Sequence, residues 1–90
     1  MITEIERKTL ALNLFKKLEK TMINLYSRWL DESEYEDIND YSINLKNEVE
    51  KINGKFLKMY KKPFGFTFQL SNATYQIMIK SSQYQYKRIA

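Results

Sequence analysis

The fold of this chain is decided by residues 64–79, which read FGFTFQLSNATYQIMI. On both sides of Ser71-Asn72, apolar side chains alternate with small or polar ones, which is the period of a half-buried strand. We therefore expect a hairpin whose two-residue loop is Ser71-Asn72. In that register the facing pairs are apolar on apolar, as one buried sheet face requires: Phe68 with Tyr75, and Phe66 with Ile77.

A further strand is expected just before this hairpin, with Leu57 and Met59 on its buried face. A loop from Tyr60 to Pro63 would place Leu57 opposite Phe66, in agreement with the hairpin register. After the hairpin, the tail from Gln83 can add a fourth strand or remain loose. The C-terminal part of the chain thus predicts an antiparallel meander of three or four strands.

The first half of the chain has a helical period instead. Thr3-Glu4-Ile5-Glu6 reads as a capping box, and a long helix to about Leu30 should follow it. Its apolar stripe is spaced alternately by four and three residues: Ala11, Phe15, Leu18, Met22, Leu25 and Trp29. At roughly 40 Å, such a helix is long for so small a domain, which favours a bend or an early stop.

A second amphipathic helix is expected after the acidic stretch Asp31–Asp40. Ser33 with Glu36 offers a second capping box, and Asp37 and Asn39 are rival caps. The helix should end at Asn53-Gly54, where glycine can take the left-handed position. A short link favours an antiparallel helix pair.

These patterns predict one α+β domain over residues 1–90, because a chain of this length builds one modest core. Residues 1–53 should form a helical hairpin, and residues 54–90 a basic β-meander. We expect the two antiparallel helices to pack on one face of the three- to four-stranded sheet. The hydrophobic share of 43% argues for a folded chain.

Charge is divided unevenly along the chain. All eleven acidic residues lie in the first 50 positions, against seven Lys or Arg, which leaves that half formally at −4. The last 40 positions hold eight Lys or Arg and no acid, a formal charge of +8. Such asymmetry points to a polyanionic partner, or to an acidic protein surface, for the basic half.

The composition excludes several kinds of chemistry. Without Cys or His the chain lacks the usual ligands of zinc and haem and the commonest general base, so we expect no enzyme, no metal and no cofactor. The acidic stretch also fails as a calcium loop, since Ser42 stands where glycine is required. No apolar run approaches the length of a membrane span, and no secretory signal is visible. We therefore expect no membrane contact and a cytoplasmic location. We also expect a monomer, because the second helix supplies an apolar face that matches the stripe of the first.

The predicted contact residues combine rings and cations on the exposed sheet face, its loop and the tail. They are Phe56, Lys58, Tyr60, Lys61, Lys62, Lys80, Tyr84, Tyr86, Lys87 and Arg88. Rings interleaved with cations can hold single-stranded nucleic acid, because bases stack on rings while ammonium groups meet phosphates. The opposing interpretation is that aromatic residues favour strands and that lysines keep a sheet edge soluble.

Two hypotheses of function follow. In the first, the protein is a non-enzymatic inhibitor or adaptor that docks through its basic half on a nucleic-acid-handling protein complex and acts by occlusion. Lys, Asn, Ile, Tyr and Phe make up 40 of 90 residues, a bias of AT-rich coding sequences that suits a phage or mobile element and hence the host cytoplasm. In the second, the basic and aromatic sheet face binds RNA or single-stranded nucleic acid directly.

Overall fold

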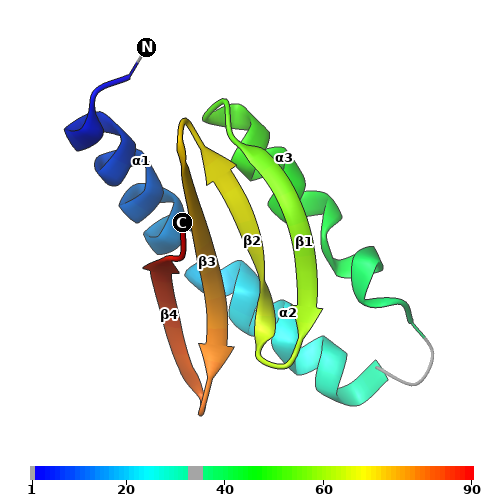
Figure 1. Ribbon diagram of the computed structural model, residues 1–90. Coiled ribbons are helices and arrows are strands. Elements are labelled where there is room, and N and C mark those ends of the chain that lie inside the picture. The colour runs from blue at the N-terminus through cyan, green and yellow to red at the C-terminus, as the bar shows by residue number, and fades with distance from the viewer. Residues whose placement is uncertain (1, 33–35) are drawn as a thin grey trace.

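A computed structural model describes residues 2–32 and 36–90 and shows a two-layer α+β domain (Figure 1). The helical layer contains α1 (Glu4–Lys17), α2 (Glu19–Glu32), the 3₁₀ helix η1 (Ile38–Tyr41) and α3 (Ile43–Lys51). The antiparallel sheet has the order β1 (Lys55–Lys61), β2 (Phe64–Leu70), β3 (Ala73–Lys80) and β4 (Gln83–Arg88). The helices cover one face of this sheet, so the predicted fold class is confirmed.

The long first helix is divided in two. Thr3 caps α1 as predicted, accepting the Glu6 backbone N–H at 3.1 Å. The helix then breaks at Leu18, whose ψ of 0° turns the chain into α2. A straight helix of this length would project beyond strands of six to eight residues, which are only about 20–27 Å long. The bend keeps the buried stripe on the sheet, with Ala11, Leu18 and Met22 all in the core.

The second predicted helix begins later than expected. Asp37, one of the rival caps, accepts the Asn39 N–H at 3.0 Å and starts η1, while α3 begins only at Ile43. The predicted capping box with Ser33 lies outside the described residues. At the other end, Asn53 and not Gly54 has the left-handed φ of 62°. At Gly54, glycine allows the backbone to pack closely against Val49, since a Cβ there would lie 2.9 Å from Val49 Cγ1.

The hairpin register is confirmed, with Phe66 opposite Ile77 and Phe68 opposite Tyr75 around the Ser71-Asn72 loop. The tail forms the fourth strand, β4, joined to β3 by a second two-residue loop, Ser81-Ser82. Both serines have positive φ, the geometry of the tight turn whose twist matches antiparallel strands.

The register predicted for β1 was wrong. Met59, not Leu57, lies opposite Phe66, because β1 continues to Lys61 and the loop is shorter than expected. A bulge between Phe56 and Lys58 then reverses the alternation. Phe56 therefore turns toward the helices, and Leu57 is left 43% exposed at the sheet edge.

One continuous core fills the space between the layers. Its fully buried large side chains come from both layers: Leu18, Met22, Tyr41, Leu45, Val49, Phe64, Phe66, Phe68, Leu70 and Ile77. Among the described residues, no helix combines the length and the apolar character that crossing a membrane needs.

Candidate partner-binding surface

The sheet face away from the helices is uncovered, and Figure 1 views the molecule from that side. Directly paired residues on neighbouring strands point to the same face, so the register assigns every paired position; Leu57, at the bulge, has no direct partner among the described residues. We call this surface the open face; it comprises Lys55, Lys58, Tyr60, Gly65, Thr67, Gln69, Thr74, Gln76, Met78, Lys80, Gln83, Gln85 and Lys87. It carries four lysines and four glutamines and no acidic residue.

Four of the predicted contact residues lie on the open face. Lys58 and Tyr60 are two positions apart on β1, and the Lys58 Nζ lies 5.3 Å from the centre of the Tyr60 ring. Lys80 and Lys87 lie on β3 and β4, and both are exposed. These cations are therefore spread over the whole width of the sheet, from one edge strand to the other.

Phe56 belongs to the other side. Because of the bulge, its ring stacks on Phe66 with centroids 5.4 Å apart and an interplanar angle of 15°. The predicted place of Phe56 on the exposed sheet face is therefore wrong.

The tail residues are also on the helical side. β4 pairs Tyr84 with Ile79, Tyr86 with Ile77 and Arg88 with Tyr75, all of which face the helices. Phe15 of α1 covers both tail tyrosines, with ring centroids 4.3 Å from Tyr84 and 4.8 Å from Tyr86. The expectation that Tyr84, Tyr86 and Arg88 extend the exposed face is therefore wrong.

A hydrogen bond from the Tyr84 hydroxyl also joins β4 to α1. It donates a hydrogen bond to the backbone carbonyl of Phe15, and burial raises the pKa of Tyr84 well above the usual tyrosine range. With Phe56, Tyr84 and Tyr86 turned inward, Tyr60 is the one aromatic ring among the described residues on the open face. The structure therefore gives no row of rings on which successive bases could stack.

The remaining predicted residues, Lys61 and Lys62, meet Lys80 at one end of the sheet. The β1–β2 and β3–β4 loops both lie at this end, around a hollow of about 290 Å³ that also contacts Tyr26 of α2. Lys61 leans toward the helices, with its Nζ 6.0 Å from the centre of the Trp29 ring. We call Lys61, Lys62 and Lys80 the basic end.

The opposite charge lies behind the sheet. Every acidic residue precedes Lys51, so those that the structure describes are in the helical layer and its connections. Several are held there by ion pairs: Arg28 Nη2 lies 2.6 Å from Glu36, and Lys17 Nζ lies 2.7 Å from Glu48. The division of charge along the sequence has thus become a division between the two layers.

Sequence reasoning missed one polar cluster, which joins α1 to the sheet. Arg7 is only 5% exposed; its Nε donates to the Tyr75 hydroxyl at 3.1 Å and its Nη1 to the Asn72 Oδ1 at 3.0 Å. A signal for it was present, because Arg7 stands four residues before Ala11, on the line of the buried helical stripe.

Residues 2–32 and 36–90 contain no group of three or more acidic side chains arranged to hold a metal ion. Comparisons with known protein families, with curated proteins and with solved structures found no match for this chain. The open face and the basic end must therefore be interpreted from their own chemistry.

Proposed function

We propose that this protein is a non-enzymatic nucleic-acid-binding protein that lays its open face against the phosphate backbone. The observation that carries the proposal is the separation of charge between the layers: a sheet face with four lysines and no acid stands in front of a layer that holds the acidic residues. A polyanion approaching such a molecule is attracted to one side and repelled by the other.

The composition of the open face favours nucleic acid over an acidic protein surface. Protein interfaces are enriched in aromatic residues, Met and Arg at their centres and depleted in Lys. Nucleic-acid interfaces are more polar and much more positive. Here Tyr60 is the one ring and Met78 is buried between its neighbours, while lysines, glutamines and threonines make up most of the rest. The glutamine amides can donate to phosphate oxygens or to base edges.

A single exposed ring also changes the form of nucleic acid that fits best. Single strands are usually held by several stacked rings, and only Tyr60 can serve here. Contacts between lysines and phosphates are independent of base sequence. We therefore expect the protein to bind duplex at least as tightly as single strands, with little preference for sequence.

The proposal is tested by fluorescence anisotropy with a labelled duplex at several salt concentrations. Neutralisation of about four phosphates predicts a log–log slope near −3.6, or roughly a hundredfold loss between 50 and 200 mM salt. Replacing Lys58, Lys80 and Lys87 together by Glu should abolish most binding while leaving the fold intact, because all three are exposed.

A matched control makes the same change of charge on the other layer. Lys16, Lys20 and Lys46 are exposed lysines of α1, α2 and α3. Their replacement by Glu should weaken binding much less than the triple change on the open face. Equal losses for the two triple variants, or no binding by the unmodified protein at 50 mM salt, would overturn the proposal.

Docking on a protein is the second candidate. One observation favours it: the bulge leaves Leu57 43% exposed beside Lys58, which gives the edge of the open face an apolar contact. In this version the protein is an inhibitor or adaptor that occludes an acidic surface of a nucleic-acid-handling complex. Capture of a protein partner that survives nuclease and is lost on Leu57→Asp, together with no affinity for free nucleic acid, would support it.

A further inference from the structure

A second basic hollow lies at the other end of the sheet, on the helical side. It has a volume of about 340 Å³ and is lined by Lys8 of α1 and by residues of β3 and β4: Tyr75, Tyr86, Lys87 and Arg88. Lys87 also borders the hollow, but its side chain belongs to the open face, so the hollow's own ligand groups are two cations and two phenols. No acidic residue within 2–32 and 36–90 lines it.

The back of the hollow is a buried polar group. Tyr75 is 3% exposed, and its oxygen accepts the Nε–H of Arg7, which is 5% exposed. Among the described residues, no acceptor is found for the Tyr75 hydroxyl proton. A hydroxyl that accepts a hydrogen bond from a cation is a stronger donor for its own proton. Tyr75 thus offers a polarised O–H at the back of the hollow, with the Glu4 carboxylate nearby, 3.7 Å from Arg7 Nη2.

Arg88 supplies the main positive charge at the mouth. Its Nε donates to the Ala90 carbonyl at 3.0 Å, which fixes the guanidinium near the end of β4. Its two terminal nitrogens make no hydrogen bond within residues 2–32 and 36–90. A guanidinium with both terminal nitrogens available matches two oxygens of one oxyanion.

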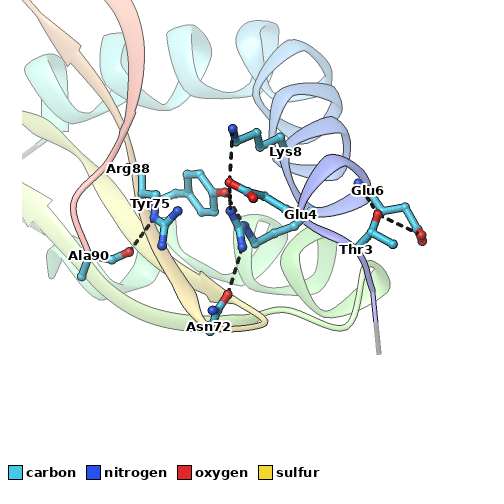
Figure 2. Close-up of polar contacts among 9 residues, drawn as sticks. Thr3, Glu4, Glu6, Lys8, Asn72, Tyr75, Arg88 and Ala90 are labelled. Carbon is cyan, nitrogen blue, oxygen red and sulfur yellow. Dashed lines mark hydrogen bonds and ion pairs between the residues drawn. The ribbon is translucent and has the colours of Figure 1, made fainter.

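Lys8 faces the hollow from the helix. Figure 2 shows Tyr75 extending from the sheet toward Lys8 and Glu4 of α1, with Arg88 beside the end of the strand. The Lys8 Nζ lies 3.4 Å from a Glu4 oxygen, and both side chains are 65% exposed. Such an exposed pair is weak, so the ammonium group can turn to a stronger anion.

We propose that this hollow is a binding site for a phosphate group, held by Arg88 and Lys8 at its mouth and by the Tyr75 hydroxyl at its back. Two positive charges match a phosphomonoester dianion, and the volume leaves room for a sugar attached to the phosphate. The phosphate can come from a small molecule or from the end of a nucleic-acid strand. Arg88 and Lys8 are not among the lysines of the open face, and only Lys87 borders both surfaces, so changes at Arg88 test the phosphate site separately from the open-face contact.

The test uses the full chain and NMR of its backbone amides. Inorganic phosphate should shift amide signals in the first turns of α1 and at the end of β4, saturably and in the millimolar range. Arg88→Gln should weaken this binding by about tenfold or more, since it removes the bidentate contact. Lys55→Gln, a matched change at the far edge of the sheet, should leave phosphate affinity unchanged.

Glu4→Gln provides a test in the opposite direction. Removing the carboxylate that competes for Lys8 should raise the affinity for phosphate about two- to threefold. A purely structural role for Lys8 and Arg88 would not produce a gain. Unchanged binding in Arg88→Gln, or shifts spread over all the lysine-bearing segments, would overturn the proposal.

The two sources are separated with a short oligonucleotide carrying or lacking a 5′-phosphate. If the strand end is the ligand, the phosphorylated form should bind more tightly, and Arg88→Gln should erase the difference. If the two forms bind alike while inorganic phosphate still depends on Arg88, a small phosphate-bearing molecule is the ligand. If neither phosphate nor either oligonucleotide shifts the amide signals of α1 and β4, the proposed phosphate site is refuted.

Discussion

Substitutions at Phe56 and Leu57 of β1 can test whether the strand has the observed bulge or the regular register that the sequence predicts. A regular strand puts Leu57 in the core and Phe56 in solvent; the bulge does the reverse. Truncating a fully buried Phe to Ala costs about 3–5 kcal/mol. Phe56 is partly buried and stacks on Phe66, so we expect Phe56→Ala to cost about 2–3 kcal/mol. Leu57→Ala, at a 43% exposed position, should cost at most about 1 kcal/mol.

Urea denaturation followed by fluorescence measures both costs. Trp29 is the only tryptophan, and it packs edge-on against Tyr41 with ring centroids 5.4 Å apart, so its emission should report loss of the core. In thermal melts, a cost of 2 kcal/mol should lower Tm by about 8–16 °C for a domain of this size. A larger loss for Leu57→Ala than for Phe56→Ala would refute the bulge and restore the regular register.

Three further changes test other parts of the structure. Gly65→Ala should cost about 1–3 kcal/mol or more by chemical denaturation, although it lies on the open face, because the new Cβ would stand 2.2 Å from the Ile77 carbonyl oxygen. The hydrogen bond from Lys17 lowers the pKa of Glu48. The ionised Glu48 therefore stabilises the fold at pH values above the ordinary glutamate pKa, and this stabilisation is lost as pH falls through the lowered pKa. In denaturation measured at several pH values, Glu48→Gln should lose less stability on acidification than the unmodified protein. Tyr84→Phe should cost about 1 kcal/mol near neutral pH by losing its bond to a backbone carbonyl. Burial raises the pKa of Tyr84, so the unmodified protein should lose that contribution as pH rises through the raised pKa, and the variant should not.

The central hairpin was predictable because apolar residues occupy one parity on both sides of a two-residue loop. β1 was not, because FLKMY places apolar side chains at both parities, and the bulge between Phe56 and Lys58 decides which of them face the core. The loop between β1 and β2 is shorter than predicted, and the bulge places Phe56 on the core side of the sheet. Local alternation cannot reveal a bulge whose benefit is a contact with Phe66, ten residues away.

The candidate site was predicted only in part, for a related reason. Alternation in the tail shows that Tyr84 and Tyr86 share a face, but not which face, since that depends on the register set by the Ser81-Ser82 loop. A pair of serines is not among the usual signatures of this tight turn. The basic character of the sheet was easier to predict, because a segment without acidic residues is basic whichever face its lysines occupy.

The hydrogen bonds that join α1 to β3 and β4 affect how the protein can fold while it is being synthesised. Arg7 finds Tyr75 across 68 positions, and Phe15 meets Tyr84 across 69. During synthesis α1 leaves the ribosome before β3 and β4, the strands that hold its partners Tyr75 and Tyr84. Closing such distant contacts is slow compared with forming the local strand pairs. The apolar side of α1 therefore stays uncovered until β4 has been made, and until then it is open to chaperones or to other chains.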